Sequence, residues 1–118
     1  GHLLEMLRGS PGVAAELWAS RLPLLPEAYA FAAAGCIAGG TRANREHLGK
    51  SLELQGNVDE TLVWLVCDAQ TSGGLLFALP EAQAEGFVQR LQTDEALGDA
   101  RIVGRIVAAE EAAVRVLP

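Results

Sequence analysis

The sequence predicts a mixed α+β fold of about five strands and five helices in one domain, and three observations support this prediction. The chain has 118 residues, which is the length of a single domain that can bury its own core. Half of the residues are hydrophobic but only 5% are aromatic, so the predicted core is aliphatic and closely packed. Segments with strand-like and helical patterns alternate along the chain, without repeats, low-complexity tracts or an internal linker.

The charge and hydropathy of the chain argue against two classes of function. The formal net charge is -6, and the nine basic residues are scattered among fifteen acidic ones, so they form no stripe that could neutralise a nucleic-acid backbone. No apolar run approaches the roughly twenty residues of a membrane-spanning helix, and no basic-then-apolar leader precedes the first helix. We therefore expect a soluble cytoplasmic protein that binds neither nucleic acid nor membranes.

Turn residues delimit the first predicted helix and strand. Residues 2–8 carry apolar side chains at helical spacing and stop at Gly9, but no capping signal precedes them. A helix without a start signal predicts that the chain begins inside a longer protein, although Gly1 and His2 could also be a remnant of a cloning tag. After a turn, residues 13–18 are expected to form a strand.

The second predicted helix begins at Pro26, because proline is favoured in the first helical turn, and ends at Gly35. It would carry Glu27 in its first turn and pack Phe31 and Ala32 on one face.

A glycine-rich run opens the third predicted helix, and its candidate site residues are Gly39, Gly40, Thr41 and Asn44. Thr41 is placed to cap a helix that runs to Leu48. Glycines that lead into a helix expose unpaired amides suited to an anion, and Arg42 and Arg45 lie within that first turn and a half. The alternative is a capped helix with two solvated arginines.

The middle of the chain predicts two strands with a helix between them. Residues 51–55 alternate leucine with polar residues, as a half-buried strand does, and Asn57 or Asp59 could cap a helix of residues 60–67. After a second glycine-rich loop, residues 75–79 are almost wholly apolar and are followed by proline, which predicts a central strand covered on both faces.

The last third of the chain predicts one helix and two strands. Residues 81–92 give the clearest helical pattern, with apolar side chains recurring on one face. Residues 101–107 and 114–117 are the expected final strands.

The cysteines and histidines predict no metal site. Cys36 and Cys67 lie among apolar neighbours, outside any Cys-x-x-Cys motif or Cys/His cluster, so buried free thiols are expected. His2 and His47 are similarly isolated.

The most unusual stretch is the second glycine-rich loop, whose candidate site residues are Asp68, Thr71, Ser72, Gly73 and Gly74. Adjacent glycines permit the close approach of a ligand or a second backbone, so this loop is either a binding surface or a demanding structural corner. Its spacing is not that of a P-loop, a dinucleotide-binding loop or a nucleophile elbow. Asp68 could be a base or a metal ligand, but a lone carboxylate before a turn more often stabilises the loop by hydrogen bonding.

Four motifs, in order, resemble the selenophosphate synthetase family, also called selenide, water dikinase. Residues 68–76, Asp-Ala-Gln-Thr-Ser-Gly-Gly-Leu-Leu, resemble a signature near the carboxyl end of that family. Residues 1–6 resemble the end of its Gly-Phe-Gly-Leu-x-Gly-His helix, residues 39–44 its glycine-threonine-asparagine motif, and residues 102–106 its penultimate strand. The chain departs from the family pattern at Ala69, where proline is common.

The resemblance implies the C-terminal domain of the aminoimidazole ribonucleotide synthetase-related superfamily, an α+β fold with a mixed sheet flanked by helices. Residues 1–118 would then be a single domain truncated at its N-terminal side. The complete enzyme of this family makes selenophosphate from ATP, selenide and water, and releases AMP and phosphate. Its catalytic cysteine or selenocysteine, a lysine and the magnesium-binding aspartates would lie outside this chain, so we expect the chain alone neither to catalyse the reaction nor to bind ATP and Mg²⁺.

The resemblance also implies that both candidate loops face the N-terminal catalytic domain, where their backbone amides could hold phosphate or selenophosphate. The full enzyme is expected to be a homodimer, formed largely through that N-terminal domain. Two alternatives remain at this point: a stand-alone interaction or scaffold domain, and a fragment of a related purine- or thiamine-phosphate synthetase. The purine enzyme lacks the Thr-Ser-Gly-Gly signature.

Overall fold

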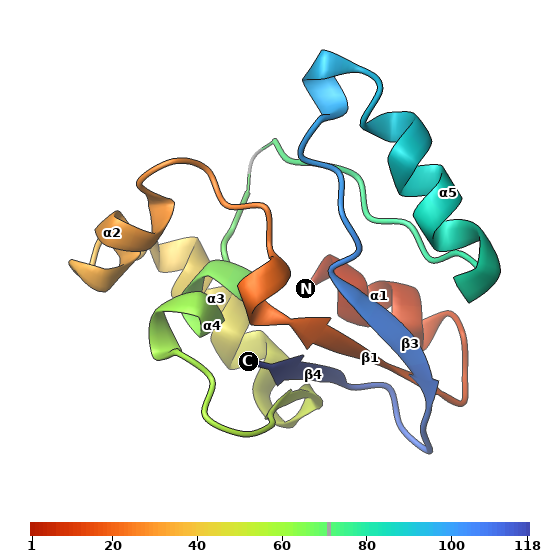
Figure 1. Ribbon diagram of the computed structural model, residues 1–118. Coiled ribbons are helices and arrows are strands. Elements are labelled where there is room, and N and C mark those ends of the chain that lie inside the picture. Colours follow the sequence, from red (N-terminus) through yellow and green to blue (C-terminus); the bar gives the residue numbers. More distant parts are fainter. Residues whose placement is uncertain (71) are drawn as a thin grey trace.

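The computed structural model describes residues 1–70 and 72–118, and this part of the chain forms five α-helices and a four-stranded sheet (Figure 1). The strands lie in the order β2-β4-β1-β3. Their bounds are Val13–Trp18 for β1, Leu52–Leu54 for β2, Gly104–Ala108 for β3 and Val114–Leu117 for β4. The predicted α+β class is confirmed, with one strand fewer than expected.

The sheet is mixed because β4 pairs in parallel with both β1 and β2, whereas β3 pairs antiparallel with β1. The last strand in sequence therefore lies inside the sheet, and β3 lies at one edge. β3 begins at Gly104, opposite Leu17. A Cβ atom at this position would collide with the backbone oxygen of Glu16, so glycine is what allows β3 to approach β1 here.

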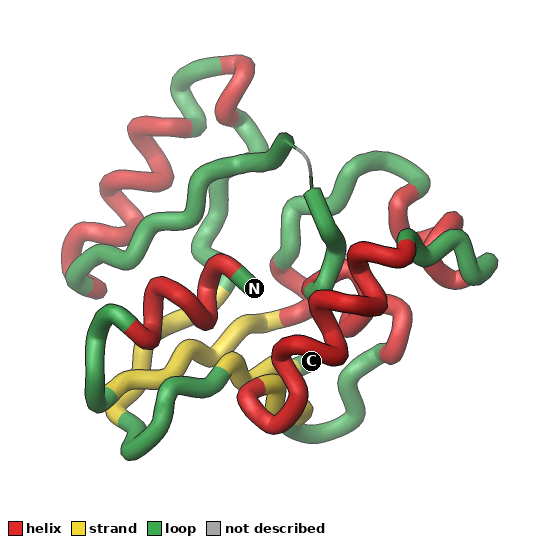
Figure 2. The backbone as a smooth tube through the Cα atoms, turned by 180° about the vertical axis from the view of Figure 1, so that it is seen from behind, coloured by secondary structure: helices red, strands yellow, loops and turns green. Residues whose placement is uncertain are grey.

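Helices flank the sheet, as the view from behind shows (Figure 2). All five helices expected from the sequence are present, although several of their ends differ from the prediction. Their bounds are His2–Arg8 for α1, Ala28–Ala33 for α2, Gly39–Leu48 for α3, Glu60–Val66 for α4 and Glu81–Leu91 for α5. Short 3₁₀ helices follow β1 at Ala19–Arg21, α3 at Gly49–Ser51 and α5 at Glu95–Leu97.

The main core joins α1 to the sheet. Leu4 and Leu7 of α1 cluster with Ala15 of β1 and with Val114 and Val116 of β4. Ala19 after β1, Leu48 at the end of α3 and Cys67 just after α4 also belong to this cluster. Within the described residues, α5 and the segments on either side of it contribute no side chain to it. Figure 1 shows α5 standing apart from the sheet, which leaves its apolar face only partly covered.

The fifth expected strand, residues 75–79, was predicted wrongly. In the described part of the chain, no backbone group of residues 72–79 forms a hydrogen bond with another backbone group. The predicted cover on both faces is also missing, since Leu75 is 84% exposed. The apolar pattern is strand-like, but a strand exists only where a neighbouring strand accepts its hydrogen bonds, and none does so here. The strand expected at residues 101–107 forms only from Gly104 onwards.

Two predicted helix starts were wrong for identifiable reasons. α2 begins at Ala28, because Glu27 has a φ of 65° and lies in the left-handed region. α3 begins at Gly39, after Ala38, so Thr41 lies inside the helix and does not cap it. By contrast, Asp59 is confirmed as the cap of α4, where its Oδ1 accepts a hydrogen bond from the Thr61 amide at 2.7 Å.

The prediction that both cysteines are buried is half right. Cys67 is buried in the core, whereas Cys36 is exposed in the segment between α2 and α3. Phe31 is likewise exposed, because α2 buries Ala32 and not the larger ring. Among the described helices, none is both long and apolar enough to span a bilayer.

Candidate functional site

Hydrogen bonds join the two glycine-rich segments that the sequence singled out. The Thr41 hydroxyl of α3 donates to Asp68 Oδ1 at 2.8 Å, and the Ala69 amide donates to Thr41 Oγ1 at 3.4 Å. One turn later, Asn44 Nδ2 donates to the backbone oxygen of Cys67 at 3.1 Å. These bonds join the start of α3, residues 39–44, to the beginning of the loop that follows α4. We call residues 39–44 and the described residues of that loop, 68–70 and 72–74, the two-loop junction.

Thr41 is the buried centre of this junction. Its side chain is 2% exposed, and its single hydroxyl both donates and accepts a hydrogen bond. A buried hydroxyl must satisfy its polar atoms internally, and Thr41 does so entirely through the loop that follows α4. It therefore holds the loop in place and does not present its hydroxyl to solvent.

Gly40 lets the two segments of the junction touch. A Cβ atom on Gly40 would lie 2.8 Å from the Cβ atom of Ala69, closer than two carbon atoms can pack. Gly39 and Gly40 are themselves exposed, so the start of α3 remains open on its outer side. The absence of a side chain at Gly40 is thus a packing requirement of the junction.

The remaining candidates of the second loop lie at the surface. Asp68, Ser72, Gly73 and Gly74 are exposed, and Thr71 lies outside the described residues. Neither Gly73 nor Gly74 is among the described glycines with positive φ, so the left-handed conformation does not explain them. A Cβ atom on Gly73 would lie 2.8 Å from Oε1 of Gln70, the far end of a flexible side chain.

The two arginines of α3 stack on Trp64 of α4. The guanidinium of Arg45 lies 4.2 Å from the centre of the indole ring and that of Arg42 lies 5.4 Å from it. Arg45 also forms an ion pair with Glu60, whose hydrogen bond raises the pKa of Arg45. Arg42 forms no ion pair within the described residues, so its charge is available beside the junction.

A cavity of about 190 Å³ lies against the inner side of the junction. Thr41 and Asp68 form its polar part, and Phe31 and Trp64 line it together with Cys36. Sequence reasoning did not place these aromatic residues and Cys36 beside the site. They come from α2, the segment after it and α4, and only the packing of those helices brings them together.

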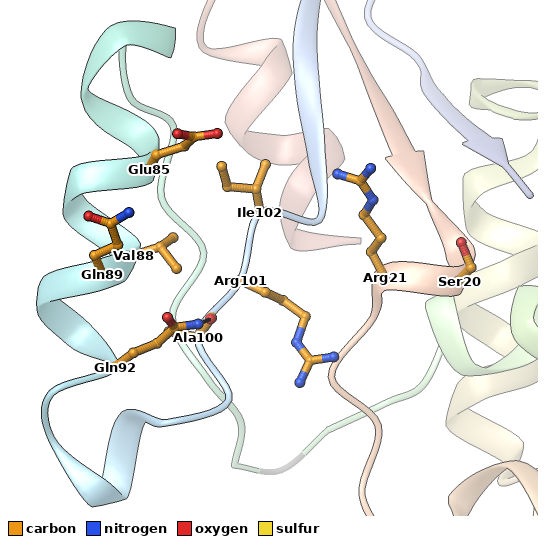
Figure 3. A pocket seen from close by; sticks show the side chains of 9 residues that line it. All are labelled: Ser20, Arg21, Glu85, Val88, Gln89, Gln92, Ala100, Arg101 and Ile102. Carbon is orange, nitrogen blue, oxygen red and sulfur yellow. Dashed lines mark hydrogen bonds between the residues drawn. The ribbon is translucent and has the colours of Figure 1, made fainter.

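A second, more open cleft of about 620 Å³ separates α5 from the rest of the fold (Figure 3). Its lining includes Val88 and Gln89 of α5, Arg101 and Ile102 of the segment before β3, and Arg21 of the 3₁₀ helix after β1. Figure 3 shows the guanidinium groups of Arg21 and Arg101 pointing towards opposite ends of the cleft, so they do not converge on one ligand. Sequence reasoning did not foresee this cleft.

The described residues offer no metal centre. Residues 1–70 and 72–118 contain no group of three or more His, Cys, Asp or Glu side chains that could hold a metal ion. Burial raises the pKa of the Cys67 thiol, which favours the neutral thiol over the thiolate. The donor groups of the described residues therefore do not fit Mg²⁺, and no step that requires the ion is assigned to them.

No protein-family model matches the chain. Individual curated proteins do match it. A selenide, water dikinase of Myxococcus xanthus is 38% identical over 109 residues, which is 92% of this chain. Another, from Clostridioides difficile, is 33% identical over 117 residues, which is 99% of this chain. The chain belongs to the selenide, water dikinase family.

This chain spans only part of each relative. It covers 30% of the Myxococcus xanthus selenide, water dikinase and 33% of the one from Clostridioides difficile. A third selenide, water dikinase, from Photorhabdus laumondii, is 48% identical over 86 residues, which is 72% of this chain and 24% of that protein. The similarity therefore concerns about one third of a selenide, water dikinase.

Proposed function

We propose that residues 1–118 form the C-terminal domain of a cytoplasmic selenophosphate synthetase, which converts selenide, ATP and water into selenophosphate, AMP and phosphate. The domain supports and partly closes an active site whose catalytic groups belong to an N-terminal domain of the same parent chain. By itself the domain is inactive. The parent enzyme uses Mg²⁺ and is a homodimer.

The two-loop junction is the observation that carries this proposal. Two motifs that resemble those of the family lie 27 residues apart in sequence, yet Thr41 and Asp68 are joined by a hydrogen bond of 2.8 Å. The outer residues of the junction are exposed, while its central hydroxyl is buried. Such a surface is held in one conformation by its buried hydrogen bonds, and its exposed residues remain accessible to a ligand.

The chemistry available at this surface suits an oxyanion. Gly39 and Gly40 are exposed at the start of α3, where backbone amides carry the partial positive charge of a helix N-terminus. Residues 72–74, which follow Asp68 in the second loop, are exposed as well. Arg42 adds a full positive charge close to the junction. We assign to these groups the binding of product phosphate or selenophosphate.

Magnesium belongs to the other part of the proposed enzyme. The ion would screen the phosphates of ATP and hold them for transfer. The described residues of this chain do not form a site for it, so its ligands would be the aspartates of the N-terminal domain. The contribution of this chain is to position, through Thr41 and Asn44, the loop that meets the phosphate.

A domain exchange tests the proposal directly. Residues 1–118 replace the homologous region of the Myxococcus xanthus enzyme, which is 38% identical over 109 residues. Selenide-dependent release of AMP should persist in the chimera, and the isolated 118-residue chain should release none. A chimera that folds, as judged by circular dichroism, but releases no AMP would contradict the proposal.

The coding sequence upstream of Gly1 provides an independent test. A glycine-rich segment with cysteine or selenocysteine and then lysine, followed by a domain with several aspartates, is the expected result. A start codon immediately before Gly1 would favour a stand-alone domain instead.

A further inference from the structure

A run of exposed apolar side chains directly follows the two-loop junction. Leu75 is 84% exposed, and Leu76, Phe77 and Leu79 are exposed as well. Isolated apolar side chains are common on protein surfaces, but a run of them is characteristic of a surface that contacts a partner.

The backbone of this stretch also lacks partners. Within the described residues, the amides and carbonyls of residues 72–79 form no backbone hydrogen bond. The stretch is nevertheless anchored, because the ring of Phe77 packs edge-on against Phe87 of α5 with 5.4 Å between ring centres. An anchored, extended segment with free backbone groups can accept another strand.

The sequence of the stretch carries none of the features that keep an exposed strand from pairing. No charged residue occurs between Asp68 and Glu81, although the chain as a whole has a net charge of -6. Edge strands that remain solvent-exposed are commonly protected by lysine or an inward-pointing charge. Residues 75–79 have no such protection, which indicates that they are covered in the working protein.

We propose that residues 75–79 are a docking strand, which adds by backbone hydrogen bonds to a strand of the N-terminal domain of the parent chain. This inference rests on the proposed function. Two arguments favour this occupant. In the proposed function, the junction that directly precedes the stretch faces that domain, and about two thirds of each relative lies outside the part that this chain matches. Alternation along an added strand would place Leu75, Phe77 and Leu79 on one face.

Hydrogen exchange on two forms of the protein tests the backbone part of this inference. The amides of residues 75–79 should exchange at least about tenfold more slowly in the complete parent chain than in the isolated residues 1–118. Equal exchange rates in both forms would overturn the inference, because the amides of residues 75–79 would then gain no hydrogen bonds from the rest of the parent chain. Protection in the isolated chain that rises with protein concentration would also overturn it, since a second copy would then be the partner.

A charge substitution tests the side-chain part. A protease site is inserted before Gly1 of the complete parent chain, and the cleaved pieces are passed through a size-exclusion column. The wild-type pieces should elute together, and Leu75→Lys should release residues 1–118 as a separate peak. Leu25→Lys is the matched control, because Leu25 is 79% exposed but lies before α2, away from the docking strand. If Leu75→Lys co-elutes as well as Leu25→Lys does, the inference is wrong.

These results can be separated from the test of catalysis. If residues 75–79 hold the pieces together but the parent shows no selenide-dependent AMP release, only the proposed reaction fails. If the parent makes AMP and Leu75→Lys leaves the pieces associated, only the docking strand fails.

Discussion

Thr41 and Asp68 are joined by a hydrogen bond of 2.8 Å, with the threonine hydroxyl buried inside α3 and the aspartate exposed after α4. The bond connects a buried residue of α3 to an exposed loop, so a substitution of Thr41 should change the position of that loop. The same hydroxyl accepts a hydrogen bond from the Ala69 amide, so Thr41 holds both Asp68 and Ala69 at the start of the loop.

Thr41→Val should remove both hydrogen bonds while nearly keeping the volume of the side chain. In the complete enzyme we expect kcat for AMP release to fall by about tenfold or more, with KM for ATP little changed, because the loop loses its position and not its own groups. The free energy of unfolding should fall by about 1–3 kcal/mol, measured in urea. Thr41→Ser keeps the hydroxyl and should restore most of the activity. Equal kcat values for the two variants would show that the hydroxyl does not position the loop.

Gly73→Val should lower turnover of the complete enzyme and leave folding of the domain largely intact. The added side chain would meet only the flexible end of Gln70, but it would cover backbone groups that we assign to phosphate. Initial rates of AMP release and a thermal melt measure the two effects. Gly98→Ala serves as the control, since its Cβ would make only an ordinary 3.6 Å contact with the Glu95 backbone, and its turnover should match the wild type. Unchanged turnover in Gly73→Val would place the loop away from the chemistry.

Leu4→Ala should destabilise the domain by about 2–5 kcal/mol, because it leaves a cavity in the core between α1 and the sheet. Leu4 is 1% exposed. Leu25→Ala, at an exposed position, should change the free energy of unfolding by no more than about 0.5 kcal/mol. Urea denaturation of both variants measures the difference. A small effect at Leu4 would mean that α1 does not belong to the cooperative core.

The contact between Tyr29 and Asp59 predicts a loss of stability at both ends of the pH scale. The Tyr29 hydroxyl donates to Asp59 Oδ2, which lowers the pKa of Asp59 below its ordinary value of 3.8 and raises that of Tyr29 above 10.0. The lowered pKa contributes stability that is present above pH 3.8 and is lost as pH falls through the folded pKa of Asp59. The raised pKa contributes stability that is present below pH 10.0 and is lost as pH rises through the folded pKa of Tyr29.

Tyr29→Phe tests this prediction, because it removes the donor and keeps the ring. The melting temperature of the variant should lie below that of the wild type at neutral pH, and the difference should narrow at pH 2 and at pH 11. A difference that stays constant from acid to alkali would show that the bond makes no pH-linked contribution.

Local signals were sufficient for the helices and for most strands. Asp59 precedes the first turn of α4 and caps it, and the turn before residue 13 marked the start of the strand that became β1. Residues 75–79 also carry a local strand signal, a short apolar run followed by proline, but strand formation depends on a partner that local patterns do not contain. Likewise, the left-handed φ of Glu27 is a backbone choice that composition does not reveal.

The sequence was sufficient to predict which loops form the candidate site, but not how their residues are arranged in space. The glycine-rich motifs predicted candidate sites at residues 39–44 and 68–74, and hydrogen bonds do join the first segment to the start of the second. The contact of Gly40 with Ala69 and the position of Trp64 beneath Arg42 and Arg45 depend on how α3 crosses α4. Such a crossing results from tertiary packing and leaves no motif in either helix.

The position of β4 has a consequence for how the protein is built. Residues 114–117 are the only link between β2 and the pair formed by β1 and β3 in the described sheet. During synthesis the sheet cannot assemble until residues 114–117 have been made. Until then, the edges of β1 and β2 that pair with β4 stay exposed. Deletion of residues 114–118 should therefore separate β2 from the pair formed by β1 and β3. We expect such a truncated chain to depend on chaperones or to aggregate.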